Sequence, residues 1–353
     1  MKVAIVGVGA IGGFIGARLA AAGQCDVSAI AQGATLAAMR EHGWRLNQGS
    51  KLIQAPARVS DSAADLGRQD LVIVALKGPV LPRVAPAISA LIGPDTVVLP
   101  AMNGVPWWFG MGTALGDAPL QSVDPGGTVA RHIPLSHVLG CVVHASSSRG
   151  APGIVNHLMG QGLILGEAAD GASARATRMG ELLTGAGFDV TVSPNVRYDI
   201  WYKLWGNLTM NPVSAITGAT IDRLLADPLV REFCSSAMRE AAAIGRQIGC
   251  DITQNPEDRH AVTAKLGAFK TSMLQDVEAG RDIELDSIVT AVHEMGQRLN
   301  VATPHINALL GLSRLFGRVH HVYPEARLLQ VFRPASARCP ASNFAAGDSE
   351  RSS

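Results

Sequence analysis

The sequence predicts a two-domain fold, with an α/β Rossmann-type domain at the N-terminus followed by an all-α domain. Three observations carry this prediction. The chain opens with a short apolar run that leads into the glycine motif GVGAIG. Apolar runs then alternate with helical segments as far as residue 192, and from residue 195 to about residue 315 the pattern has helical periodicity only.

The length of the chain, 353 residues, also favours two domains. We place the first domain at 1–194 and the second at 195–320. The remaining segment, 321–353, is rich in Pro, Ser, Ala and Arg, and this composition predicts a disordered tail.

The first strand and the helix after it are predicted to bind a dinucleotide. Residues 2–6 form the strand, and 13–23 form a helix of small residues. Gly7 permits a tight turn, Gly9 lets the backbone approach a pyrophosphate, and Gly12 lets the helix pack closely on the strand. The helix N-terminus supplies free N–H groups and a positive dipole end. We therefore expect the whole motif to contact the cofactor: Gly7, Val8, Gly9, Ala10, Ile11 and Gly12.

The second strand, predicted at 26–31, bears on the choice of cofactor. An acid at the end of this strand would accept the 2′-hydroxyl of NAD and repel a 2′-phosphate. The chain has Gln32 there, followed by Gly33, so the sequence favours NADP. An arginine that could bind the phosphate is absent at Gln32, and Arg40 on the next helix is the alternative.

The rest of the first domain is predicted to continue the α/β pattern. We expect strands at 70–76, 96–99, 138–145, 154–157, 163–165 and 190–192, with helices at 80–92 and 172–187. Lys77 and Asn103-Gly104 each follow an apolar strand. Ligands bind at the carboxyl ends of parallel strands. We therefore expect both positions beside the cofactor, although a solvated lysine and an ordinary turn are the alternatives.

A polar stripe marks the start of the helical domain. Lys203, Asn207 and Asn211 are spaced i, i+4 and i+8, which places them on one helix face over about 12 Å. Their neighbours are almost all apolar. Such a stripe is costly unless it lines a cleft, although a merely solvated helix face is the alternative. Pro212 predicts that the helix is in its last turn at Asn211.

A third segment, 270–286, predicts a helix end, a turn at Gly280 and a new helix start. Ser272 and Glu284 lie in it. Acids at a helix start are often only caps that complement the helix dipole, so the residues alone do not place these two in a site.

Composition argues against several classes of function. The net charge is +1 with both signs interspersed, which favours neither nucleic acid nor an anionic membrane as partner. The five cysteines are scattered, and neither they nor the ten histidines show metal-ligand spacing, so we expect no metal and a cytoplasmic location. No apolar run reaches membrane-spanning length. The apolar residues of 224–315 are sufficient for a homodimer interface.

The motifs in this order resemble the ketopantoate reductase (2-dehydropantoate 2-reductase) family over the chain up to about residue 318. The resemblance is carried by the glycine loop, Lys77, Asn103-Gly104, the pattern KxxxNxxxNP at 203–212, and Ser272 with Glu284 downstream. It implies a C-terminal domain like that of 6-phosphogluconate dehydrogenase and an active site between the domains. It also implies reduction of ketopantoate, a small 2-keto acid, to pantoate with NADPH, a step towards coenzyme A.

The resemblance also implies a role for each matching residue. Lys203 corresponds to the family's catalytic lysine, and Glu284 to an acid that helps to close the complex on substrate and cofactor. Asn207, Asn211 and Ser272 correspond to substrate-binding positions. Asn103, Ser146 and Lys77 correspond to positions on the cofactor side.

Three departures from the family pattern put the substrate in question. Ile221 and Phe269 stand where the family has asparagines, and the bulky loop 105–108, which contains Trp107 and Trp108, stands where many members have small residues. Loss of a hydrogen-bonding residue changes discrimination strongly. Another branched 2-keto acid is therefore the main alternative substrate. A non-catalytic NADP-sensing protein is the alternative from a different class, and the intact Lys203 and Glu284 argue against it.

Overall fold

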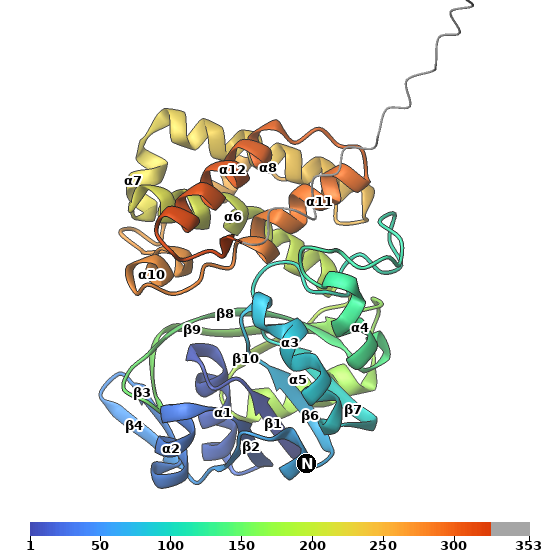
Figure 1. Ribbon diagram of the computed structural model, residues 1–353, viewed down its shortest axis with the longest axis vertical. Coiled ribbons are helices and arrows are strands. Elements are labelled where there is room, and N and C mark those ends of the chain that lie inside the picture. The colour runs from blue at the N-terminus through green and yellow to red at the C-terminus, as the bar shows by residue number, and fades with distance from the viewer. Residues whose placement is uncertain (326–353) are drawn as a thin grey trace, which may run out of the picture.

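Five parallel strands form the first sheet, in the order β5-β2-β1-β6-β7 (Figure 1). The computed structural model describes residues 1–325, and these strands are β1 (Lys2–Val6), β2 (Asp26–Ile30), β5 (Arg58–Ser60), β6 (Gln69–Val74) and β7 (Ile92–Pro100). The chain leaves β1 for β2 on one side and later returns to β6 on the other. This reversal beside β1 is the point at which open α/β sheets bind ligands, at the carboxyl ends of the strands.

A second, mixed sheet contains the strands predicted at 138–145, 154–157, 163–165 and 190–192, together with two strands, β3 and β4, that the sequence did not predict. Its strands run in the order β10-β9-β3-β4, with β8 paired to β9, and they are β3 (Trp44–Gln48), β4 (Lys51–Ala55), β8 (Leu139–Arg149), β9 (Ile154–Glu167) and β10 (Asp189–Val192). The two expected strands at 154–157 and 163–165 are one continuous strand. Two glycines, Gly160 and Gly162, interrupt the apolar run between them, and the stretch 158–160 is exposed.

The glycine-rich helix α1 (Ala10–Ala22) lies between the two sheets. A Cβ on Gly16 would lie 2.3 Å from the Trp44 ring, and one on Gly13 would lie 2.5 Å from Val155. The small residues of this helix therefore let strands of the second sheet approach it, in addition to any role at the cofactor. The remaining helices of this part are α2 (Gly33–His42), α3 (Leu81–Ile88), α4 (Thr128–His132) and α5 (Ala174–Gly185).

The helical part is built around α6 (Val196–Thr217), as Figure 1 shows. Most residues of α6 are buried, and Lys203 and Asn207 of the polar stripe are half-buried, so the stripe is not a solvated helix face. The surrounding elements are α7 (Ile221–Ala226), α8 (Pro228–Gln247), α9 (Pro256–Ala264), α10 (Ser272–Glu278), a π-helical turn (Asp286–Thr290), α11 (Ala291–Arg298) and α12 (Pro304–Val319). The predicted fold, a Rossmann-type domain followed by a helical domain, is confirmed.

One local prediction in the helical part is wrong. The helix does not end near Asn211, because α6 continues through Pro212 to Thr217 and ends at Gly218, which has a φ of 69°. The helix end, turn and new helix start predicted within 270–286 are present, because α10 ends at Glu278, Gly280 has a φ of 61° and the π-helical turn begins at Asp286. The helix that ends there is short, however, and starts only at Ser272. The Thr271 side chain accepts a hydrogen bond from the Leu274 amide and so caps α10 at its N-terminus.

The first residues of the predicted tail are packed against the helical part. Val322 is 2% exposed and its carbonyl accepts a hydrogen bond from the Ile283 amide, while the Tyr323 hydroxyl donates to Asp286 at 2.7 Å. The prediction of disorder for the rest of this segment concerns 326–353 and lies outside the described residues. Within 1–325, no helix has the length and apolar character needed to cross a bilayer.

Candidate active site

The glycine loop after β1 has the geometry of a pyrophosphate cradle. Gly7 has a φ of 94°, which side chains with a Cβ rarely adopt, and a Cβ on Gly12 would lie 2.1 Å from the Gly7 carbonyl oxygen. A Cβ on Gly9 would meet no atom within 4 Å. The loop is therefore closed where helix and strand meet, and open at Gly9, where a ligand would approach.

The N-terminus of α1 leaves its first amides free for an anion. Gly9 is the N-cap, no side chain caps the helix, and the first turn has no acid. Val8, Ala10 and Ile11 are partly exposed around this opening. Free N–H groups and the positive end of the helix dipole fit the pyrophosphate of a dinucleotide.

The residues at the end of β2 leave the 2′-position of a cofactor without an obvious partner. Gln32 is exposed and no acid follows β2. Arg40 lies on α2 about 12 Å from Gln32 along the helix axis, so the structure does not place the two side by side. Asp61 is exposed and follows β5, the neighbour of β2 in the sheet.

Lys77 and Gly78, which follow β6, contact the helical part. The Lys77 ammonium lies 2.8 Å from the Asp276 carboxylate and donates to the Asp282 carbonyl at 2.6 Å. Glu284 accepts a hydrogen bond from the Gly78 amide at 3.2 Å. Burial raises the pKa of Glu284 above its ordinary value. Two residues expected in the site are thus held at the junction of the two parts.

Lys203 of α6 reaches across to the sheets. Its ammonium donates to the Asn103 side-chain oxygen at 3.0 Å and to the Val143 carbonyl at 2.7 Å. Desolvation of the ammonium lowers the pKa of Lys203 to about 8, although the negative charge of Glu284 acts in the opposite direction. The lysine therefore stays protonated at neutral pH but can release its proton.

Lys203, Asn207 and Asn103 line one small pocket, together with Met102, Gly104, Cys141, Val142, Ile200 and Leu204. Lys203 and Asn207 of the stripe thus face the loop after β7. This loop is pressed against the helical part, because the Val105 amide donates to the Ser287 carbonyl at 2.7 Å. The pocket brings a proton donor and two amides together in apolar surroundings.

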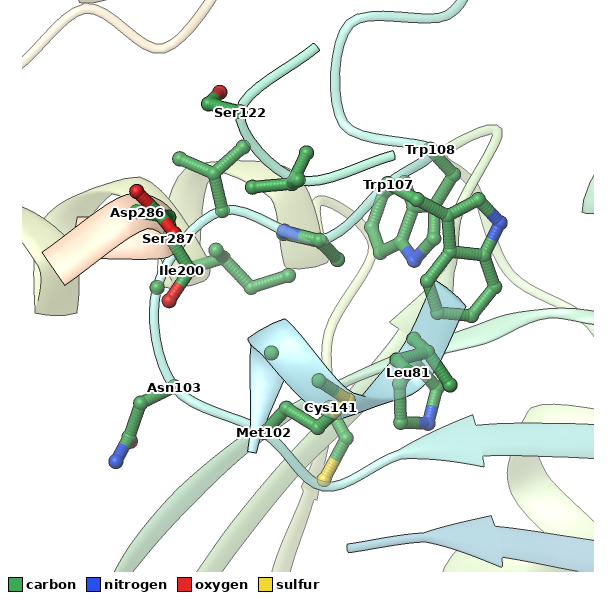
Figure 2. A pocket seen from close by; sticks show the side chains of 16 residues that line it. Leu81, Met102, Asn103, Trp107, Trp108, Ser122, Cys141, Ile200, Asp286 and Ser287 are labelled. Carbon is green, nitrogen blue, oxygen red and sulfur yellow. The ribbon is translucent and has the colours of Figure 1, made fainter. Parts of the chain in front are cut away.

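A second, larger pocket adjoins the first (Figure 2). The two share Met102, Asn103, Gly104, Cys141 and Ile200. Trp107 and Trp108 lie on one side of the view and Asn103 on the other, with its amide pointing away from the indoles. Both tryptophans are buried, at 3% and 0% exposed. The bulky loop therefore fills the space behind Asn103 and forms an apolar wall.

The other expected site residues lie further from the ammonium. Asn211 is 5% exposed, two helical turns from Lys203, and lines neither pocket. Ser272 is exposed on the first turn of α10, and its hydroxyl makes no hydrogen bond within residues 1–325. Ser146 lies three residues beyond Val143 on β8, at an irregularity in its pairing with β9.

The two positions that lack the family's asparagines lie side by side. The Ile221 amide donates to the Phe269 carbonyl at 3.1 Å. Both side chains join an apolar cluster, together with Met210, Val213, Leu224, Cys234 and Leu309. Two apolar side chains thus stand where the resemblance implies asparagines. Both belong to this apolar cluster, and neither lines either pocket.

Sequence reasoning missed several residues of this region. Asp276, Gly78 and Cys141 contact or line it, and all three are distant in sequence from their partners. Asp276 looks like an ordinary surface acid in the sequence, and no spacing rule links it to Lys77. Within residues 1–325, no three His, Cys, Asp or Glu side chains form a group that could hold a metal ion.

The cradle at Gly9 and the polar pocket between sheet and helices define the class of the protein, a two-domain dinucleotide-binding oxidoreductase. Comparison with known proteins supports this class. Residues 3–170 match the family profile described as ketopantoate reductase PanE/ApbA, and 195–316 match its C-terminal counterpart. The chain belongs to the ketopantoate reductase family.

Individual relatives cover almost the whole chain. A 2-dehydropantoate 2-reductase of Mesorhizobium japonicum is 41% identical over 316 residues, which are 89% of this chain and 97% of the relative. A protein of Ralstonia solanacearum provisionally described as a ketopantoate reductase has a crystal structure that is 50% identical. Its TM-score is 0.88, with 91% of this chain and 99% of that chain covered. The crystal structure of a PanE/ApbA family ketopantoate reductase of Ralstonia eutropha is 25% identical in sequence, with a TM-score of 0.78. The match covers 91% of this chain and 100% of that chain.

Proposed function

We propose that the protein reduces 2-dehydropantoate (ketopantoate) to pantoate with NADPH, and that Lys203 is the general acid. The observation that carries this proposal is the position of the Lys203 ammonium, held between the Asn103 amide oxygen and the Val143 carbonyl in the pocket between the two parts. The relatives named 2-dehydropantoate 2-reductase support the choice of substrate.

The chemistry follows from the charge that develops on the substrate. A reduced dinucleotide held on the loop 7–12 would supply the hydride that the carbonyl carbon accepts. The Lys203 ammonium stabilises the negative charge on the carbonyl oxygen and transfers one proton to it, which gives the hydroxy acid. A pKa of about 8 suits this role, because the proton is present at neutral pH and not held too tightly.

The surrounding residues orient the reactants. Asn207, one turn along α6, offers a neutral amide that can hold a substrate oxygen without competing for the ammonium charge, and we assign Asn211 and Ser272 to the outer part of the same substrate site. We assign Glu284, bonded to the Gly78 amide, to the closing of the site over its ligands. We assign Lys77, Asn103 and Ser146 to the binding of the cofactor.

We propose NADP rather than NAD as the cofactor, held on the loop 7–12 with its 2′-phosphate beside Gln32. The absence of an acid after β2 supports this choice. We further propose a cytoplasmic homodimer. In support, the four cysteines of the described chain are free, and α12 exposes the apolar stripe Leu312, Leu315 and Val319.

The test is the loss of NADPH absorbance on addition of ketopantoate, run beside NADH and beside other branched 2-oxo acids. Rapid turnover that prefers ketopantoate and NADPH is the expected result. Turnover of another 2-oxo acid, without turnover of ketopantoate, would show that ketopantoate is not the substrate and would leave the proposed mechanism standing. Tight NADPH binding with no turnover of any 2-oxo acid would overturn the reductase proposal and favour an NADP-sensing protein.

A further inference from the structure

Arg259 of α9 lies beside the polar stripe of α6. Its guanidinium lies over the Tyr202 ring, 4.8 Å from the ring centroid. A Cβ on Gly206 would lie 3.0 Å from Arg259 Nε and 3.3 Å from Nη2, so this glycine makes room for the guanidinium against the backbone of α6. Gly206 lies directly before Asn207 and three residues after Lys203. The arginine therefore borders the face that carries the proposed proton donor.

The Arg259 guanidinium has no carboxylate partner among the described residues. Nε is buried without an acceptor, and within residues 1–325 Arg259 forms no ion pair. Glu257, two residues earlier on the same helix, is paired with Arg231 instead. Buried donors in proteins are almost always bonded, and an unpaired cation held in a fixed place is a common feature of anion sites.

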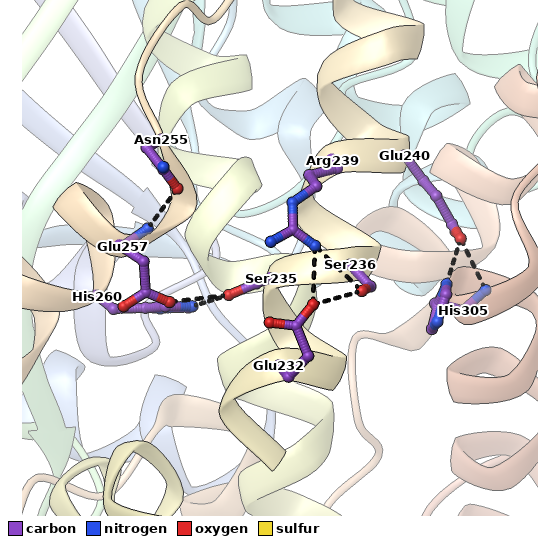
Figure 3. A network of polar contacts seen from close by, with 9 residues as sticks. All are labelled: Glu232, Ser235, Ser236, Arg239, Glu240, Asn255, Glu257, His260 and His305. Atoms are coloured by element: carbon purple, nitrogen blue, oxygen red, sulfur yellow. Dashed lines mark hydrogen bonds and ion pairs between the residues drawn. The ribbon is translucent and has the colours of Figure 1, made fainter. Parts of the chain in front are cut away.

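The position of Arg259 is fixed by the residues around it. Figure 3 shows how α9 is attached to α8. The Asn255 side chain accepts from the Glu257 amide at 3.2 Å and so caps α9, and buried His260 is hydrogen bonded to the Ser235 hydroxyl at 3.0 Å. Arg259 lies between these two anchors in sequence, so its approach to Gly206 is built into the packing of the two helices.

Its charge acts on the groups of the pocket. The positive charge of Arg259 contributes to the lowered pKa of Lys203, after desolvation. It also helps to lower the pKa of His144 on β8 to about 4, after desolvation of the imidazole and the charge of Lys203. Lys203, His144 and Arg259 thus lie within electrostatic reach of one another. The negative charge of Glu284 also acts on Lys203, whose pKa it raises. The Glu284 carboxylate accepts a hydrogen bond from the Gly78 amide.

We propose that Arg259 binds the carboxylate of the 2-oxo acid substrate, with Lys203 directed at the neighbouring carbonyl oxygen. This inference rests on the proposed function. In a 2-oxo acid the carboxylate is attached to the carbonyl carbon, so a site needs a cation beside its proton donor. A guanidinium suits this role because its planar N–H groups match the two carboxylate oxygens. It would supply substrate affinity in a chain that has Ile221 and Phe269 in place of two amides.

The experiment compares Arg259→Gln with the matched control Arg246→Gln. Arg246 is an exposed arginine of α8, whose Nε lies 3.5 Å from exposed Asp251. We expect Arg259→Gln to raise the KM for ketopantoate about 10- to 100-fold, the range for loss of a charge-assisted hydrogen bond. The Kd for NADPH should stay within about twofold of the wild-type value, and Arg246→Gln should leave both unchanged.

Two further measurements separate substrate binding from structural support. Wild-type enzyme should use 3-methyl-2-oxobutanoate much better than its uncharged methyl ester, and Arg259→Gln should lose most of this preference, whereas Arg259→Lys should regain part of it. If Arg259→Gln fails to fold, Gly206→Ala displaces the guanidinium without removing it and should raise the same KM.

The outcomes distinguish this inference from the function on which it rests. Turnover of ketopantoate by the wild type with equal KM values for the Arg259→Gln and Arg246→Gln variants would overturn the role of Arg259 and leave the reductase standing. A weakened Kd for NADPH with unchanged KM for ketopantoate would likewise overturn it. Absence of wild-type turnover with any 2-oxo acid would overturn both proposals.

Discussion

The Lys77 ammonium lies 2.8 Å from the Asp276 carboxylate, so an ion pair joins the end of β6 to α10 across 199 residues of sequence. Asp276 is 8% exposed and also receives the Arg281 guanidinium at 2.9 Å. The lysine that we assign to the cofactor side is therefore held by the helical part, and this contact links the two parts next to the proposed site.

A double-mutant cycle would measure this link. We expect Lys77→Ala, Asp276→Ala and the double variant to show a coupling of about 0.5–1 kcal/mol in the free energy of unfolding, because the Lys77 side chain is 34% exposed and water screens the pair. Unfolding in urea at low and high salt is the measurement. Additive effects of the two substitutions at low salt would show that the pair does not hold the parts together.

Replacement of Lys203 tests the proton donor. Lys203→Ala should lower kcat about 10²- to 10⁴-fold, the usual contribution of a general acid, because burial raises the pKa of the Cys141 thiol in the same pocket to about 12, too high to replace the ammonium. Binding of NADPH, followed by fluorescence titration, should be retained since Lys203 lies on the substrate side. Near-normal kcat in a folded Lys203→Ala variant would remove Lys203 from the mechanism.

The pH profile should report the same group. Desolvation lowers the pKa of Lys203 to about 8, so the ammonium predominates below that pH and disappears above it. We therefore expect kcat/KM for reduction to be constant near neutrality and to fall tenfold per pH unit well above pH 8. A profile that stays flat to pH 10 would mean that proton donation does not depend on Lys203.

Glu284 should shift that profile. Its negative charge raises the pKa of Lys203, in opposition to desolvation. Glu284→Gln keeps an acceptor for the Gly78 amide but removes the charge, so the descending limb of kcat/KM should move to lower pH. The same pH series on the variant is the measurement, and a limb that stays in place or moves to higher pH would contradict electrostatic coupling of the two groups.

A carboxylate at the end of β2 should change the cofactor preference. Gln32→Asp would place a negative charge where we expect the 2′-phosphate, and we expect the ratio of kcat/KM with NADPH to that with NADH to fall about tenfold or more, a change of about 1.4 kcal/mol. Gln32→Asn is the matched control and should change the ratio little. An unchanged ratio in Gln32→Asp would mean that position 32 does not face the phosphate.

Local patterns were enough to predict much of the fold. The strand and glycine loop at 2–12 lie within one short segment, and the helical spacing of Lys203 and Asn207 needs only the geometry of a single helix. These features depend on residues close in sequence, where periodicity and turn chemistry act. Two strands of the second sheet, β3 and β4, were missed because they are short and partly polar. β3 pairs with β9, about a hundred residues away, and β4 pairs with β3.

The contacts of the site could not be predicted in the same way. Lys203 and Asn103 are a hundred residues apart, and the Lys77–Asp276 pair spans twice that distance. Pro212 indicated a helix end, but the surrounding helices bury α6 on all sides, and this packing outweighs the loss of one backbone hydrogen bond. Arg259 gives no signal in the sequence, since a charged residue near a helix start is commonplace.

Gly104 sets a limit on how relatives of this protein can be recombined. It has a φ of 79°, and a Cβ at this position would lie 2.4 Å from the Ser287 carbonyl oxygen, while the next amide donates to that same oxygen. The loop after β7 and the π-helical turn are therefore fitted to each other at backbone level. A chimera that joins the sheets of one family member to the helices of another will keep this junction only if both segments come from the same parent.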